Sequence, residues 1–126
     1  DDLHHLQRGG RISKTTAIVG SIINIKPLLK VTAEGKLEAA GSVRGRKKSI
    51  ATLVSQMESN MTEEWKPLNT TIAIAHANCP DEAASLAQTI KDKFGIKNVM
   101  INDINPSIGV HAGPGAILIA YFGKER

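Results

Sequence analysis

The residue with the clearest chemical potential is His111, in the segment 108–115, where three glycines and Pro114 surround it. Glycine lets a backbone approach a ligand closely or adopt a positive φ. Histidine changes charge near neutral pH, so an imidazole held in such a loop can hydrogen-bond or neutralise a small anion. An ordinary tight turn before a buried strand over 116–122, with an incidental histidine, is equally compatible with the local pattern.

A second candidate is the basic run at residues 44–48, which reads Arg-Gly-Arg-Lys-Lys. Such a run can contact nucleic-acid phosphate. However, aromatic residues make up only 3% of the chain and are scattered, so we expect no stacking platform for single-stranded nucleic acid. The run falls at the predicted junction of a strand and a helix. A solvated face is the commonest role there, with protein or phosphate contact as the alternative.

The segment 9–13, Gly-Gly-Arg-Ile-Ser, has the composition of a phosphate-binding turn before a helix. It matches neither the P-loop nor the dinucleotide-binding pattern, because no Gly-Lys-Ser/Thr follows and no strand precedes it. Arg11 could pair with a carboxylate or a phosphate through its planar fork. A helix C-cap with an interdomain salt bridge fits the segment equally well.

The remaining reactive residue types indicate structure rather than catalysis. His4 and His5 are adjacent, so on a helix they point in different directions and we expect a solvated or capping role. His76 ends a predicted buried strand and is interpreted as a core histidine. Cys79 has no partner base nearby, and the acids at 81–82 suit the first turn of a helix. No carboxylate pair, serine elbow or zinc spacing is present, which disfavours an enzyme and a metal site.

Length and composition indicate one globular domain. The chain has 126 residues, 41% of them hydrophobic, and a formal charge of +4. Its single cysteine excludes an internal disulfide and favours a cytosolic, reducing compartment. No apolar stretch approaches the roughly 20 residues that cross a bilayer. The chain begins directly in helical-looking sequence without a leader, as we expect of a domain excised from a longer protein.

Hydrophobic periodicity predicts an α/β domain. Two short helices, over 3–8 and from Ser13 to Asn24, precede a hairpin whose arms are 25–32 and 36–44. A helix over 45–60 follows, with Ile50, Leu53, Val54, Met57 and Met61 on its buried side. The next predicted elements are a strand over 71–77, a helix over 81–94 with Ala84, Leu86, Ala87, Ile90 and Phe94 buried, and strands over 98–104 and 117–122.

Strand–helix–strand steps favour parallel crossovers, whereas the hairpin requires an antiparallel pair. We therefore expect a two-layer sandwich with a mixed β-sheet covered by helices.

The ordered set of these motifs resembles the C-terminal domain of the DegV family, bacterial fatty-acid-binding proteins, over the whole of residues 1–126. The matching segments are 2–13, 20–29, 43–48, 76–78 and 108–115.

The resemblance implies a two-domain protein that clamps a long-chain fatty acid between its halves. The family's Gly-x-His-x-Gly-Pro-Gly motif falls on Gly109, His111 and Gly113, which assigns the carboxylate head group to His111. Hydroxyl residues of the N-terminal domain, absent from this sequence, would complete that site. The implied tunnel wall for the acyl chain comprises Ile18, Ile22, Ile23 and Leu28, for each of which ordinary core packing is the alternative.

Family members are similar to the lipid-carrying subunit of a bacterial fatty acid kinase, and they present the bound acid to a separate kinase subunit. The resemblance therefore implies a partner surface or anion contact at Arg11, Arg44 and Arg46, with no catalysis, cofactor or metal in this chain. Two alternatives stay open: a phosphate-handling enzyme domain related to dihydroxyacetone kinases, and a basic regulatory or nucleic-acid-binding domain. The fatty-acid-carrier interpretation, which we favour over both alternatives, predicts no nucleic-acid partner and no membrane span. It also predicts that this half alone binds lipid weakly.

Overall fold

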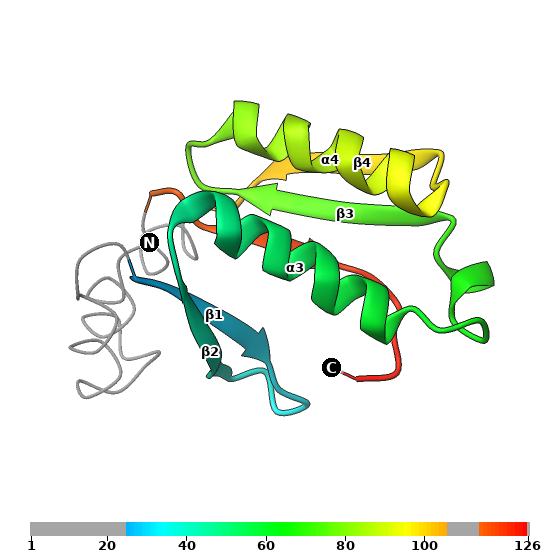
Figure 1. Cartoon of the computed structure of the whole chain (residues 1–126), viewed down its shortest axis with the longest axis horizontal. Helices are drawn as coiled ribbons and strands as arrows, with labels where there is room; N and C mark the ends of the chain where they lie inside the picture. Colours follow the sequence, from blue (N-terminus) through cyan, green and yellow to red (C-terminus); the bar gives the residue numbers. More distant parts are fainter. Residues whose placement is uncertain (1–24, 106–113, 126) are drawn as a thin grey trace.

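The structure, a computed structural model, describes residues 25–105 and 114–125 (Figure 1). The two helices predicted over 3–8 and 13–24 therefore lie outside the described residues. The described elements are β1 (Ile25–Val31), β2 (Leu37–Arg44), α3 (Arg46–Asn60), the short 3-10 helix η1 (Lys66–Leu68), β3 (Thr71–His76), α4 (Pro80–Phe94), β4 (Asn98–Asp103) and β5 (Ile117–Ala120).

β1 and β2 form the predicted antiparallel hairpin. Thr32 closes its turn, donating its N–H to the carbonyl of Lys36 at 2.8 Å and accepting the N–H of Gly35 at 2.9 Å. Gly35 has a φ of 78°, which a residue with a side chain rarely adopts. The Glu-Gly pair at 34–35 therefore sets the hairpin, as the sequence predicts.

Pro27 lies inside β1, where it faces Ser42 of β2. Among the described residues β1 pairs with β2 alone, so Pro27 occupies an edge strand, the position expected for a residue without an N–H. The register shifts just after it: Leu28 pairs with Gly41 but Leu29 pairs with Ala39. The extra residue in β2 makes a β-bulge, which bends the hairpin.

Among the strands that the structure describes, β3 is the centre of a three-stranded sheet with the order β4-β3-β5. β4 runs parallel to β3, with His76 beside Asp103 at the end of the pair. β5 runs antiparallel to β3 and places Ile117 beside the same histidine. The sheet is therefore mixed.

Both long helices contribute to one core. α4 connects β3 to the parallel β4 and contacts both strands, while α3 lies between the hairpin and β3 (Figure 1). Ile72 and Ile74 of β3 are buried beneath these helices. The helix residues of the core are Val54, Met57, Ala83, Leu86, Ala87 and Ile90.

The helices follow the predicted bounds closely, and Gly95 ends α4 in the left-handed conformation with a φ of 66°. One predicted core residue is wrong, because Ala84 is exposed and Ala83 is buried in its place. Residues 83, 86, 87 and 90 form one stripe at helical spacing, and position 84 lies off that stripe.

The last strand also differs from its prediction. It ends at Ala120 rather than at Phe122, and only one of its faces is covered. Ile117, Ile119 and Tyr121 pack against the core, whereas Leu118 and Phe122 are exposed. An apolar run can thus alternate between core and surface, because successive side chains of a strand point to opposite faces.

The α/β class with a mixed sheet and helices over one face is confirmed. In the described part of the chain the hairpin forms its own two-stranded sheet, joined to the rest through α3. The hairpin satisfies its pairing locally, so its sequence pattern does not require it to join the larger sheet.

Candidate functional site

Most residues that the sequence assigns to the fatty-acid site fall outside the described residues. These are the head-group residues His111, Gly109 and Gly113, the tunnel residues Ile18, Ile22 and Ile23, and Arg11. The described chain does include the two ends of the loop that carries His111, at Asn105 and Pro114. It also includes Leu28, Arg44 and Arg46.

Leu28 is the described member of the predicted tunnel wall. Its side chain is only 6% exposed in β1, at the position just before the bulge. It is not part of the main core cluster that the described residues form around β3 and the two long helices. Leu28 is therefore buried apart from that cluster, in the hairpin.

The basic run separates into residues with different surroundings. Arg44, Lys47 and Lys48 are exposed at the junction of β2 and α3. Arg46, the first residue of α3, is half-buried instead and donates from Nε to Glu82 Oε2 at 2.8 Å. A second donation, from the terminal guanidinium nitrogen Nη2 to Glu82 Oε1 at 3.4 Å, makes the contact a fork.

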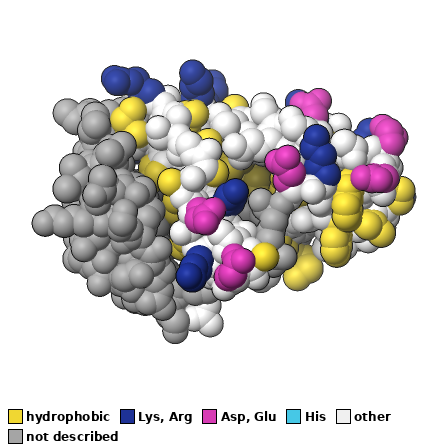
Figure 2. All heavy atoms as spheres, turned by 90° about the horizontal axis from the view of Figure 1, so that it is seen from below, with side chains coloured by type: hydrophobic (Ala, Val, Ile, Leu, Met, Phe, Trp, Pro, Cys, Tyr) yellow, Lys and Arg dark blue, Asp and Glu magenta, His cyan; other side chains and the backbone are white. Residues whose placement is uncertain are grey.

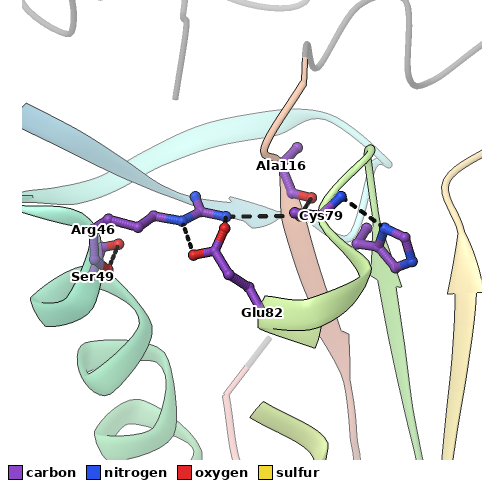
Figure 3. Close-up of polar contacts among 6 residues, drawn as sticks. Arg46, Ser49, Cys79, Glu82 and Ala116 are labelled. Atoms are coloured by element: carbon purple, nitrogen blue, oxygen red, sulfur yellow. Dashed lines mark hydrogen bonds and ion pairs between the residues drawn. The ribbon is translucent and has the colours of Figure 1, made fainter. Parts of the chain in front are cut away.

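The Arg46–Glu82 pair joins the first turns of the two long helices (Figure 3). Glu82 lies in the first turn of α4, where a negative charge also complements the helix dipole. Ser49 closes the first turn of α3 by donating its hydroxyl to the carbonyl of Arg46 at 2.6 Å. The ion pair therefore fixes the start of α3 against the start of α4.

Cys79 lies beside this ion pair, just before α4. Its Sγ lies 3.8 Å from Arg46 Nη2, and its thiol donates to the carbonyl of Ala116 at 3.7 Å (Figure 3). Burial raises the pKa of the Cys79 thiol above its ordinary value, even though the nearby Arg46 cation acts in the opposite direction. A thiol held in its protonated form is a hydrogen-bond donor, not a nucleophile.

The turn between β3 and α4 (residues 77–79) is bonded to the chain that enters β5. Ala77 donates its N–H to the carbonyl of Ala116 at 2.9 Å, and Gly115 donates its N–H to the carbonyl of Ala77 at 2.7 Å. These two backbone bonds and the Cys79 thiol hold the last residues of the Gly-Pro-Gly motif against the carboxyl end of β3. Asn78, in the middle of the turn, has a left-handed φ of 56°.

His76, the last residue of β3, lies directly before this turn and contacts it. It is only 6% exposed, and its Nδ1 accepts the N–H of Cys79 at 3.2 Å. Its Nε2 lies 3.5 Å from Asp103 Oδ1 on β4. The interpretation of His76 as a buried histidine at the end of its strand is confirmed, with a hydrogen bond at Nδ1 and a longer contact to a carboxylate at Nε2.

The polar cluster formed by Arg46, His76, Cys79 and Glu82 connects elements of the fold to one another. Across residues 25–105 and 114–125, no three His, Cys, Asp or Glu side chains come together as a metal-binding group. No helix in the same ranges combines the length and hydrophobicity that crossing a bilayer requires. What the cluster can do chemically is hold backbone groups in place beside the motif that contains His111.

The surface seen from below in Figure 2 is mixed in charge: over most of it, basic side chains lie next to acidic ones. Hydrophobic side chains gather at the end opposite the undescribed residues. Nucleic-acid binding requires a continuous basic surface to neutralise phosphates. This face does not provide one.

Sequence reasoning missed two links of this cluster. The partner of Arg46 is Glu82, 36 positions away, and Glu82 had been assigned only a helix-dipole role. The bonds between the turn 77–79 and residues 115–116 are also long-range. Their only signal in the sequence is that His76-Ala77-Asn78 and the Gly-Pro-Gly motif both flank predicted strands.

The fold defines a class: a small α/β domain with a mixed sheet whose polar cluster lies at the carboxyl end of the central strand. The family model described as "Uncharacterised protein, DegV family" matches residues 1–124. The chain therefore belongs to the DegV family.

Relatives in Clostridium support this assignment. The chain is 40% identical over 126 residues to a DegV domain-containing protein of Clostridium perfringens, covering 100% of the chain and 42% of the relative. It is 41% identical to a second such protein, of Clostridium acetobutylicum, with the same coverage. The chain thus spans less than half the length of these curated relatives.

Solved structures share the fold. A fatty-acid-binding DegV family protein of Streptococcus agalactiae is 31% identical with a TM-score of 0.77, over 94% of this chain and 41% of that one. A fatty-acid-binding DegV family protein of Thermus thermophilus is 29% identical with a TM-score of 0.77, over 96% of this chain and 42% of that one. The fatty acid kinase B3 protein of Streptococcus pneumoniae, loaded with linoleic acid, has a TM-score of 0.82 at 22% identity, over 98% and 42%, and supports the fold alone.

Proposed function

We propose that this chain is the C-terminal half of a fatty-acid carrier, which holds a long-chain fatty acid by its carboxylate and its acyl chain. One observation carries the proposal: the chain belongs to the DegV family over residues 1–124, and solved family members at 29% and 31% identity bind fatty acids. The matching fold supports transfer of that activity, since their TM-scores are both 0.77.

The proposed head-group ligand is His111, with Gly109 and Gly113 beside it in the same motif. A protonated imidazole donates a charge-assisted hydrogen bond to a carboxylate, and a neutral one still donates from one nitrogen. Flanking glycines let the carboxylate approach the backbone. The bonds that hold Gly115 and Ala116 on the turn 77–79 support this proposal, because they give the loop a fixed end.

The proposed acyl tunnel is lined by Ile18, Ile22, Ile23 and Leu28. Leu28 supports the assignment, because its side chain is buried away from the main core cluster. Apolar walls suit an acyl chain, since each buried methylene contributes about 0.8 kcal/mol.

The proposed partner is a separate kinase subunit that phosphorylates the bound acid, so this chain has no catalysis, cofactor or metal of its own. The family resemblance and the exposed basic residues between β2 and α3 support the proposal of a kinase partner. Arg44 is the better placed of the two described arginines, because it is exposed whereas Arg46 is half-buried against Glu82. Arg11 is the third proposed contact.

The proposal includes an N-terminal domain that forms the other wall of the site. The chain covers 42% of its Clostridium relatives, which leaves room in those proteins for a second domain. We also propose a cytoplasmic location, in which Cys79 stays reduced.

The test is native mass spectrometry of the polypeptide that carries both halves, purified from bacteria and followed by lipid extraction. We expect a retained long-chain fatty acid. His111→Ala should weaken retention about ten- to a hundredfold, because it removes a hydrogen bond to a charged group. His4→Ala is the matched control, since it also removes one histidine and should leave the lipid bound.

A protein that neither retains nor takes up fatty acid would overturn the carrier proposal and leave the family assignment intact. Equal lipid retention in the His111→Ala variant would overturn the head-group assignment alone.

A further inference from the structure

His76 lies at the carboxyl end of the central strand β3, beside the first residue of β5. It is the last residue of β3, with Asp103 of β4 on one side and Ile117 of β5 on the other. The residue is only 6% exposed, so its polar ring is buried among backbone groups of the turn that follows it. A buried imidazole must have partners for its nitrogens, and these partners fix its role.

The hydrogen bond that His76 accepts indicates which of its nitrogens carries the proton in the neutral ring. Nδ1 accepts the N–H of Cys79 at 3.2 Å, so Nδ1 is unprotonated. In a neutral imidazole the proton is then on Nε2, which lies 3.5 Å from Asp103 Oδ1. The ring is therefore oriented from two sides, by the turn on one nitrogen and by the neighbouring strand on the other.

The backbone group that His76 holds belongs to the same turn that anchors residues 115 and 116. Cys79 is two residues beyond Ala77, whose N–H and carbonyl bond Ala116 and Gly115 at 2.9 and 2.7 Å. Asn78, between them, has a φ of 56°, a left-handed conformation that asparagine adopts more readily than most residues with a side chain. Nδ1 of His76 accepts the N–H of Cys79, the residue after Asn78, and so closes the turn.

We propose that His76 is a positioning residue for fatty-acid binding. Its Nδ1 holds the turn 77–79 in the shape that anchors Gly115 and Ala116, the described end of the head-group loop. This inference rests on the proposed function and adds a residue to it. It assigns His76 no contact with the lipid, because the histidine acts through the turn.

The chain offers matched substitutions that separate the two ring nitrogens. In His76→Asn, Oδ1 can take the place of the Nδ1 acceptor. In His76→Gln, the side-chain amide reaches the Nε2 position and leaves no acceptor near Cys79. Both replacement side chains are polar and uncharged. If only the loss of the imidazole ring mattered, the two variants should therefore bind lipid equally. His76→Leu removes both polar positions.

The measurement is calorimetric titration of oleate into the delipidated polypeptide that carries both halves, with the midpoint of urea unfolding recorded for each variant. We expect His76→Asn to bind with an affinity close to that of the native protein. His76→Gln and His76→Leu should bind about three- to tenfold more weakly, as loss of one hydrogen bond predicts. Native-like affinity in His76→Gln, or a loss in His76→Asn equal to that in His76→Leu, would overturn the inference.

Hydrogen exchange on the same proteins makes the test independent of lipid binding. We expect the amides of Cys79 and Gly115 to lose protection in His76→Gln and to keep it in His76→Asn. Failure of the native protein to bind oleate would count against the proposed function. Unchanged protection of Gly115 in His76→Gln would count against the role of His76.

Discussion

At the residue scale, the polar groups at the start of α4 are arranged to hold backbone rather than to react. Glu82 takes the fork of Arg46, and Cys79 donates its thiol to Ala116. Burial raises the pKa of that thiol, so it stays protonated at neutral pH. This chemistry differs from that of a catalytic cysteine, whose pKa is lowered by neighbouring cations.

The raised pKa of Cys79 predicts how stability depends on pH. A group whose pKa is higher in the folded than in the unfolded state contributes stability that is full below the unfolded value, about 8.5 for a thiol, and lost above the folded value. We therefore expect the native protein to lose stability relative to Cys79→Ser as the pH rises above about 8.5. Urea unfolding at a series of pH values measures this difference.

Serine does not titrate in that range, and all other groups are common to both proteins, so the difference isolates Cys79. A relative gain in the stability of the native protein with rising pH would contradict the raised pKa. The rate of alkylation by iodoacetamide provides a second check, and we expect it to be slower at pH 7 than for a free cysteine.

At the element scale, α4 is held to the sheet by one narrow stripe. The buried residues of this stripe are Ala83, Leu86, Ala87 and Ile90. Ser85 and the other positions between residues 83 and 90 that lie off the stripe face solvent. The stripe covers Ile72 and Ile74 of β3, so α4 fixes the strand whose end carries His76.

This arrangement predicts opposite outcomes for adjacent positions of α4. Leu86 is 2% exposed, so Leu86→Ala should reduce the free energy of unfolding by about 2–5 kcal/mol through lost burial and a cavity. Ser85→Ala, on the exposed side, should change it by less than about 0.5 kcal/mol. Urea unfolding of the two variants measures both, and similar losses would show that the buried stripe is misassigned.

At the scale of the whole molecule, the helices cover one face of the three-stranded sheet and leave apolar side chains on the other. Met100 lies beside Ala73 and Leu118 beside Ala75, and the two are 52% and 43% exposed. Because paired residues of adjacent strands share a face, these four side chains form one apolar surface. An exposed apolar surface of this kind is what the two-domain proposal expects, because large apolar patches mark surfaces that contact a partner or a ligand.

The two-domain proposal predicts that this chain alone binds long-chain fatty acid much more weakly than the polypeptide carrying both halves. One wall of the proposed site would face water, and part of the acyl chain would lose its burial. Titration calorimetry with oleate on the two proteins measures the difference, and we expect at least about tenfold. Equal affinities would contradict the clamp and place the whole site within residues 1–126.

The sequence by itself determined the elements that depend on neighbouring residues. The hairpin follows from alternation around Glu34 and Gly35, and the end of α4 follows from Gly95. Periods of two and of 3.6 residues are local signals, so they appear in the chain before any long-range contact forms. The family resemblance rested on the same local motifs, and the comparisons confirmed it.

Only the tertiary structure decided which elements and residues pack against one another. Within residues 25–105 and 114–125 it made the hairpin a separate sheet and left one face of β5 exposed. It also paired Arg46 with Glu82 and joined the turn 77–79 to residues 115 and 116. A strand carries the same sequence whichever strand lies beside it, and a charged residue has no local mark of its distant partner. These contacts depend on how the whole chain packs, because burial and hydrogen bonding are satisfied across elements rather than within them.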